Sequence, residues 1–350
     1  MHSRIDEIQS FLDHRDYSLA VRRTLDSCLD SGNALLLKEA IAWSKIYHAH
    51  QKGALPDTFF SQAATLLEKL KNVSADFTYS RRPLLSADHI SKTYTKGNFS
   101  LHPISLQINS GDITGVVGQN GNGKTTLLRC LAGQLSIDDG RLQYNQLDHP
   151  DHYTIKHHVA FIPQRIPRWY GLLKDNLHFS ASLSGVTGEQ NKMMVEFMLE
   201  RLDLSAYAHL TWKQISSGYR TRFEIARILL QKPKLLILDE PLANLDINAQ
   251  QTILTDLRYL AKSVHNPMGI ILSSQQLHEV EKVADTVLLI KEGNCLFRTG
   301  EQNSVTANHV LELETDAERS LILSQGSSRS SRTHFRKWLV AMISIALKPI

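Results

Sequence analysis

The sequence has few cysteines, a small net charge and no long apolar run. Cys28, Cys130 and Cys295 are far apart, which disfavours a disulfide framework or a cysteine metal site and is typical of a reducing compartment. The formal net charge of +4 over 350 residues is too small to indicate a nucleic-acid partner. The longest apolar run, residues 338–347, has ten residues, whereas a membrane-spanning helix needs roughly 20. The polar start, MHSRIDEIQS, does not resemble a signal peptide.

The segment GQNGNGKTT matches the phosphate-binding loop pattern G-x4-G-K-[ST]. Gly118 and Gly123 bracket its four variable residues, and glycine lets several backbone N–H groups approach one phosphate closely. Lys124 adds a cation for the β- and γ-phosphates, and Thr125 offers a hydroxyl to Mg²⁺. The predicted nucleotide-binding residues are Gly118, Gln119, Asn120, Gly121, Asn122, Gly123, Lys124, Thr125 and Thr126.

The surroundings of this loop favour a bound phosphate. An apolar run, residues 113–117, precedes the loop as a buried strand would, and an apolar helix pattern, residues 125–135, follows it. A helix in that position points the positive end of its dipole at the phosphates. The alternative, a glycine-rich turn with no ligand, is disfavoured by this context.

A second motif, LLILDE, ends a predicted buried strand about 110 residues further on. Asp239 at the end of this strand is predicted to hold Mg²⁺, directly or through water. Glu240 is predicted to polarise a water molecule against the γ-phosphate. Two solvated acids after a strand are the alternative, and the phosphate-binding loop upstream disfavours it.

These motifs, in this order and at this spacing, resemble the nucleotide-binding domain of ABC ATPases over residues 84–305. The resemblance implies that Tyr94, in SKTYTKG, stacks on adenine, with an ordinary strand tyrosine as the alternative. It also implies that Gln164, in FIPQ, reaches both Mg²⁺ and the attacking water. The implied magnesium ligands are therefore Thr125, Gln164 and Asp239.

Residues 215–230, ISSGYRTRFEIARILL, resemble the family signature and the helix that follows it. The usual signature is L-S-G-G-Q, so Ser217 here replaces a glycine and Tyr219 replaces a glutamine. The resemblance implies that this segment binds the ATP of a partner subunit through Ser216, Ser217 and Gly218. Asp246, in ANLD, matches the loop that crosses to that partner.

The switch segment departs further from the family, because Gln275 stands where a histidine is usual. An amide can donate a hydrogen bond to a γ-phosphate but cannot carry a proton. His278, one helical turn further on, is an alternative for the missing role. The predicted catalytic residues are Glu240, Gln164 and Gln275, and we expect slow hydrolysis.

The resemblance implies an α/β P-loop NTPase fold with a mainly parallel sheet, an antiparallel β edge and a helical subdomain at about residues 165–220. Recurring apolar positions predict an all-α N-terminal region, residues 1–80, before the ATPase domain at 84–305. This region is either a small bundle packed on the ATPase or a docking or regulatory module. Residues 306–350 are predicted to be a flexible C-terminal tail, which either contacts an anionic membrane surface or has no role.

Two further segments carry local predictions. Residues 165–177, RIPRWYGLLKDNL, are expected near the contact with a membrane partner, with Trp169 and Tyr170 either as surface anchors or in local packing. The histidine-rich residues 147–158 fit no standard metal spacing and are predicted to be a solvated loop.

The resemblance implies an ATP-binding and ATP-hydrolysing subunit of an ABC transporter, with a general likeness to exporters. It would use ATP and Mg²⁺, act as a homodimer or heterodimer of ATPase domains, and power a separate membrane-spanning permease. Its expected location is cytoplasmic, peripheral on the inner face of the cell membrane. The alternatives are a soluble ABC ATPase acting on nucleic acid, the ribosome or a protein complex, and a nucleotide-binding regulator that barely hydrolyses ATP.

Overall fold

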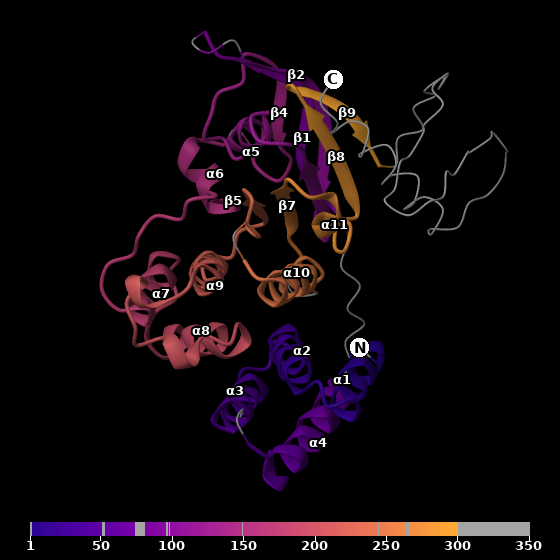
Figure 1. Cartoon of the computed structure of the whole chain (residues 1–350). Coiled ribbons are helices and arrows are strands. Elements are labelled where there is room, and N and C mark those ends of the chain that lie inside the picture. Colours follow the sequence, from indigo (N-terminus) through magenta and orange to yellow (C-terminus); the bar gives the residue numbers. More distant parts are fainter. Residues whose placement is uncertain are drawn as a thin grey trace, which may run out of the picture.

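The computed structural model describes most of the chain (Figure 1). The described residues are 2–50, 53–73, 81–95, 97, 99–148, 150–243, 245–263 and 266–299. The predicted C-terminal tail, residues 306–350, lies outside them. Within the described ranges, no helix combines the length and the apolar character needed to cross a bilayer.

Four helices precede the first strand: α1 (His2–Asp13), α2 (Tyr17–Asp30), α3 (Ala34–Ala49) and α4 (Asp57–Asn72). Local sequence fixes two of their starts, because the side chains of Asp16 and Asn33 accept hydrogen bonds from the first free N–H groups of α2 and α3. The apolar faces meet around Trp43, which stacks on Phe59 at 4.9 Å and donates its indole N–H to the Phe59 carbonyl at 2.9 Å. An all-α region before the ATPase sheet is therefore confirmed.

The strands are β1 (Pro83–Thr93), β2 (Ser100–Asn109), β3 (Ile113–Val117), β4 (Asp139–Tyr144), β5 (Val159–Ile162), β6 (Leu235–Leu238), β7 (Gly269–Ser274), β8 (Thr286–Lys291) and β9 (Asn294–Arg298). A small antiparallel sheet has the order β2–β1–β4. A larger sheet has the order β5–β6–β7–β3–β8–β9, and its neighbours are parallel except β8 with β9. The predicted mainly parallel sheet with antiparallel β elements is confirmed.

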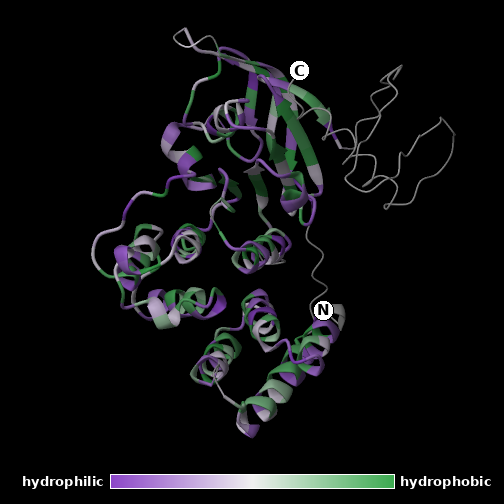
Figure 2. Cartoon of the chain, viewed as in Figure 1, coloured by the Kyte–Doolittle hydropathy of each residue, from purple (hydrophilic) through white to green (hydrophobic). Residues whose placement is uncertain are grey.

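The remaining helices are α5 (Lys124–Leu131), α6 (His152–His158), α7 (Leu173–Leu183), α8 (Gly188–Arg201), α9 (Ser217–Leu229), α10 (Ile247–Ala261) and α11 (Leu277–Val280). Strands β3, β6 and β7 are buried along their whole length because α5 and the small sheet cover one face of the larger sheet and further helices cover the other. Figure 2 shows β8 as hydrophobic along nearly all of its length. Helix α5 packs its leucines between the two sheets, which fixes the phosphate-binding loop at the carboxyl end of β3.

Helix α6 corrects one prediction, since residues 152–158 are helical and not a loop. Asp151 caps this helix by accepting a hydrogen bond from the Thr154 N–H at 2.7 Å. None of its side chains is buried, so the segment is solvated as predicted.

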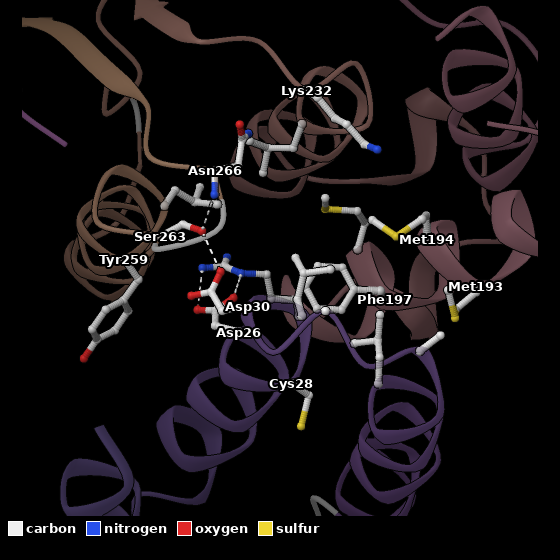
Figure 3. A pocket seen from close by; sticks show the side chains of 18 of the residues that line it. Asp26, Cys28, Asp30, Met193, Met194, Phe197, Lys232, Tyr259, Ser263 and Asn266 are labelled. Atoms are coloured by element: carbon white, nitrogen blue, oxygen red, sulfur yellow. Dashed lines mark hydrogen bonds and ion pairs between the residues drawn. The ribbon is translucent and has the colours of Figure 1, made fainter. Parts of the chain in front are cut away.

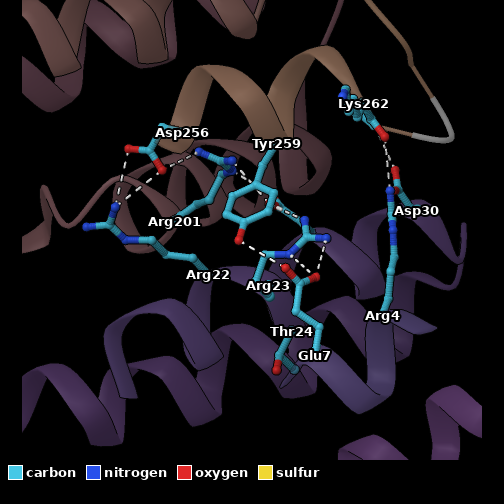
Figure 4. Close-up of polar contacts among 12 residues, drawn as sticks. Arg4, Glu7, Arg22, Arg23, Thr24, Asp30, Arg201, Asp256, Tyr259 and Lys262 are labelled. Atoms are coloured by element: carbon cyan, nitrogen blue, oxygen red, sulfur yellow. Dashed lines mark hydrogen bonds and ion pairs between the residues drawn. The ribbon is translucent and has the colours of Figure 1, made fainter. Parts of the chain in front are cut away.

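The N-terminal helices share a hydrophobic core with the ATPase, and buried ion pairs cross the contact (Figure 4). In Figure 1, α2 and α3 lie beside α8 and α10. Arg201 at the end of α8 bonds to Asp26 of α2 at 2.6 Å and to Asp256 of α10 at 3.4 Å. Arg22 of α2 reaches the same Asp256 carboxylate at 3.2 Å. The contact therefore joins three separate parts of the chain.

Candidate nucleotide-binding site

The phosphate-binding loop is built for close backbone approach. Gly123 has φ +101° and is the residue before α5, and Gly121 has φ +82°, a region that side-chain-bearing residues rarely occupy. A Cβ atom at Gly118 would lie 2.3 Å from the Ile290 carbonyl oxygen, so no side chain fits there. The chain's own backbone geometry therefore requires glycine at these positions, and their contact with a phosphate stays a prediction.

Lys124 lies inside the loop that it follows. Its Nζ donates to the carbonyl oxygens of Gly118 at 2.7 Å and Gln119 at 3.1 Å. The same ammonium is 3.0 Å from Glu240 Oε1, although both side chains are almost completely buried. The predicted phosphate-directed cation and the predicted catalytic acid are thus in direct contact across the site.

Two of the three predicted magnesium ligands, Asp239 just after β6 and Thr125 in α5, also meet. Thr125 Oγ1 donates to Asp239 Oδ2 at 2.7 Å. Ser273 of β7 was missed by the sequence reading: its hydroxyl donates to Asp239 Oδ1 at 2.8 Å and accepts from the Glu240 N–H at 2.8 Å. A serine near the end of a buried strand, beside the strand that carries the acids, is the signal that could have identified it.

Glu240 is the centre of the predicted catalytic group. Gln164 Nε2 and Gln275 Nε2 both donate to Glu240 Oε2, at 2.8 and 2.9 Å. Among the described residues, Gln275 and not His278 bonds to this carboxylate, and His278 is exposed on α11. The structure therefore brings all three predicted catalytic residues together, and their catalytic roles stay a prediction.

An aromatic pair, Tyr94 and Phe99, lies near the end of the phosphate-binding loop at Gly123. Tyr94 follows β1, is 37% exposed, and donates its N–H to the Phe99 carbonyl at 3.0 Å. The Phe99 ring, 6.4 Å from that of Tyr94, lies so close to Gly123 that a Cβ there would be 2.6 Å from it. The sequence reading missed Phe99, an aromatic residue just before the strand β2. Stacking of Tyr94 on adenine stays a prediction.

The signature residues form a separate groove. Ser216, Ser217 and Gly218, at the start of α9, line a cavity of about 270 Å³ together with Asp246, which caps α10. A Cβ at Gly218 would meet Ala249 Cβ at an ordinary 3.6 Å, so the chain's own packing does not demand glycine there. The groove lies at a helix N-terminus, which favours an anion.

Tyr219, the unusual residue of the signature, is explained by local packing. Its ring lies 4.0 Å from that of Tyr207, and burial together with the Tyr207 hydroxyl raises the pKa of Tyr219 to about 12. Its phenol therefore stays neutral at physiological pH. This residue joins α9 to the helical segment before it and does not line the phosphate-binding loop.

Trp169 and Tyr170 have different environments. Trp169 is 8% exposed, its ring centroid lies 4.9 Å from that of Trp212 in a stacked arrangement, and its indole N–H donates to Glu224 at 3.1 Å, so of the two alternatives the structure supports local packing for Trp169. Tyr170 is 78% exposed and borders a groove with Phe179 and Leu183.

Comparison with known proteins agrees with this geometry. The ABC transporter family model matches residues 101–243. The chain is 32% identical over 220 residues to the uncharacterized ABC transporter ATP-binding protein YxlF of Bacillus subtilis, covering 61% of this chain and 70% of the relative. It is 29% identical over 228 residues to the phosphonates import ATP-binding protein PhnC of Treponema denticola, covering 61% and 88%.

Comparison with solved structures also finds ABC transporter proteins. An ABC transporter in an inward-facing conformation superposes with a TM-score of 0.53 at 27% identity, covering 61% of this chain and 82% of that one. The fold alone is also shared with cbiO1 of Clostridium perfringens, with a TM-score of 0.57 at 24% identity over 62% and 88% of the two chains. The chain belongs to the ABC transporter family, as an ATP-binding protein.

Proposed function

We propose that this protein binds ATP with Mg²⁺, hydrolyses it, and thereby powers a separate membrane-spanning permease. The main support is that five side chains meet in one place. They come from the phosphate-binding loop, the end of β6 and two other segments: Lys124, Asp239, Glu240, Gln164 and Gln275. Such a group can neutralise phosphate charge at one end and hold a general base at the other.

The donor set fits Mg²⁺. Thr125 offers a hydroxyl, Gln164 an amide oxygen and Asp239 a carboxylate, and all three are hard oxygen ligands. The other ligands of the ion would be water and substrate phosphates. Bound Mg²⁺ would neutralise charge on the transferred phosphoryl group.

The contact between Lys124 and Glu240 supports a sequence of events in the site. A triphosphate offers more negative charge than one carboxylate, so Lys124 would exchange Glu240 Oε1 for phosphate oxygens. Oε1 would then be available to accept a proton from water. Gln164 and Gln275, bonded to Oε2, would hold the carboxylate in place during this exchange.

A complete site needs two ATPase domains, as a homodimer or a heterodimer. No residue of the phosphate-binding loop, 118–126, lines the signature groove, so the groove would face the nucleotide of a partner. Gly218 supports this arrangement because only an outside group would require a residue without a side chain there.

The proposed permease contact is the groove of about 370 Å³ beside α7. Tyr170, Phe179 and Leu183 are each more than 60% exposed there, which is typical of a docking surface. The proposed location is cytoplasmic, peripheral on the inner face of the cell membrane. The exporter-like direction stays a prediction, whereas the phosphonates relative is an import protein.

Two substitutions test the proposal. Lys124→Ala removes the phosphate-directed cation, so we expect at least tenfold weaker binding of a fluorescent ATP analogue at fixed Mg²⁺.

Glu240→Gln keeps the binding groups but removes the base, so turnover should fall roughly 10²- to 10⁴-fold while ATP traps a dimer on size-exclusion chromatography. Lys71→Ala, an exposed lysine at the end of α4, is the control. Unchanged affinity in Lys124→Ala, or parental turnover in Glu240→Gln, would refute the assigned roles.

A further inference from the structure

A cavity of about 490 Å³ lies where the N-terminal helices meet the ATPase (Figure 3). Its lining comes from α2 and α3 on one side and from α8, α10 and the turn between α9 and β6 on the other. The volume falls within the roughly 300–1,000 Å³ of small-molecule sites. None of the residues assigned to the nucleotide or the signature groove lines it.

One wall of this cavity is apolar. Leu29 and Leu37 line it from the N-terminal helices, and Met193, Met194 and Phe197 line it from α8. Figure 3 shows the two methionines and Phe197 on the same side. Methionine side chains are flexible and polarizable, so such a wall adapts to apolar bodies of different shapes.

The opposite wall is polar, but most of its charges are already balanced. Arg4 pairs with Asp30 at 2.6 Å, and Arg201 pairs with Asp26 at 2.6 Å. Ser263 Oγ adds a hydrogen bond to Asp30 at 2.8 Å. These groups satisfy one another and leave little net charge for a ligand.

Two lysines in the turn before β6 differ from these charged groups, because no carboxylate pairs with them in the described structure. Lys232 is exposed at the rim of the cavity, with its backbone held at φ +54° and its N–H bonded to the Leu229 carbonyl at 3.0 Å. Lys234 donates to the neutral amide oxygen of Asn266 at 2.7 Å. The ion pairs found within the described part of the chain leave both lysines without a carboxylate partner. The cavity therefore carries net positive charge beside an apolar wall.

We propose that this cavity binds a small organic anion with an apolar body, of the fatty-acid type. Its carboxylate would be held by Lys232 at the rim, Lys234 would add to the positive potential of the cavity, and its chain would lie along Met193, Met194 and Phe197. A neutral amphiphile would leave the two ammonium groups uncompensated, and a cationic one would be repelled by them.

Laurate is the probe for this site in the full-length protein. We expect saturable binding of one laurate per chain by isothermal titration calorimetry, together with displacement of 8-anilinonaphthalene-1-sulfonate. Dodecanol and dodecyltrimethylammonium, which share the chain length, should bind at least tenfold more weakly. Because ligand binding to the native state stabilises it, laurate should also raise the melting temperature.

Substitutions locate the site. Lys232→Gln, at an exposed position, should weaken laurate binding roughly tenfold through loss of a charged contact. Met194→Trp should abolish binding by filling the space along the apolar wall. Lys192→Gln, an exposed lysine of α8 that does not line the cavity, should leave laurate affinity unchanged. Binding of the fluorescent ATP analogue confirms that each variant is folded.

The proposal is overturned by absence of saturable laurate binding, or by equal affinity for the anionic, neutral and cationic probes. It is also overturned if ATP displaces laurate, because the fatty acid would then occupy the nucleotide site. If Met194→Trp does not fold, unchanged affinity in Lys232→Gln alone is sufficient to reject the site. Failure of this proposal leaves the ATPase assignment untouched, since the nucleotide site is tested by other residues.

Discussion

Glu240 has contacts that account for an unfavourable backbone conformation. Its φ is +48°, a value that costs a residue with a side chain on the order of 1–3 kcal/mol. The Glu240 N–H is held by Ser273, and its carboxylate by Gln164, Gln275 and Lys124. Such strain persists only where the surroundings fix it, and functional sites are where it usually occurs.

Gln275 gives a prediction at the scale of one residue. Its amide positions Glu240 but cannot transfer a proton, so basal hydrolysis should be slow. Gln275→His restores a titratable donor at the same place and should raise steady-state ATPase activity on the order of tenfold. Gln275→Ala should lower the activity, because Glu240 Oε2 then keeps only Gln164.

His278→Ala is the control for this experiment, because His278 is exposed and makes no contact with Glu240 in the described structure. Its ATPase rate should equal that of the parent protein. A dead His278→Ala variant beside parental rates in both Gln275 variants would show that the switch segment is misplaced.

At the scale of the element, we expect that a substitution at the start of α9 leaves the stability of the protein unchanged. Gly218 is the second residue of this helix, and an acidic side chain there interacts favourably with the helix dipole. Gly218→Asp should therefore leave urea-induced unfolding within about 1 kcal/mol of the parent protein. Turnover should fall at least tenfold, since the new carboxylate would oppose the phosphates of the partner's ATP.

Thr58→Asp is the matched control, because Thr58 is the second residue of α4 and is exposed. It introduces the same charge at the same helical position, away from the signature groove, and should not change turnover. Parental turnover in Gly218→Asp would contradict the role of the groove in a dimer.

Sequence alone predicted the parts of the site that are local. The GQNGNGKTT loop lies between β3 and α5, and LLIL forms β6 before Asp239, as predicted. Apolar runs and glycines indicate the conformation of the backbone to which they belong, so these parts could be predicted locally. Ser273 and Phe99 were missed since their importance comes from neighbours on other strands. For Trp169 the sequence left surface exposure and local packing open, because the residue that buries it, Trp212, is distant in the sequence.

At the scale of the whole molecule, Asp256 links the N-terminal helices to both halves of the ATPase. It is 1% exposed and accepts hydrogen bonds from Arg22 and Arg201. Burial lowers the pKa of Arg201, but Asp26 and Asp256 raise it more, so its guanidinium stays charged. Asp256→Ala should lower the free energy of unfolding by about 3–5 kcal/mol, since it leaves the buried Arg22 guanidinium without its carboxylate partner while Arg201 keeps Asp26.

Glu196→Ala provides the comparison for Asp256→Ala. Glu196 pairs with Lys45 at 3.3 Å across the same contact, but both side chains are about half exposed. Urea denaturation should show a loss within about 1 kcal/mol for this variant. Equal losses for the two variants would mean that burial does not decide the strength of this interface.

The buried charges also limit how the gene can change. Arg22 and Asp256 are 234 positions apart in the sequence, yet a neutral residue at position 256 removes the carboxylate that pairs with Arg22, whereas a neutral residue at position 22 leaves Asp256 with Arg201. Substitutions at these positions should accordingly arise in compensating sets during divergence. A relative that lacked the four N-terminal helices would lack Arg22 and Asp26, so an aspartate at the position of Asp256 should covary there with an arginine at the position of Arg201.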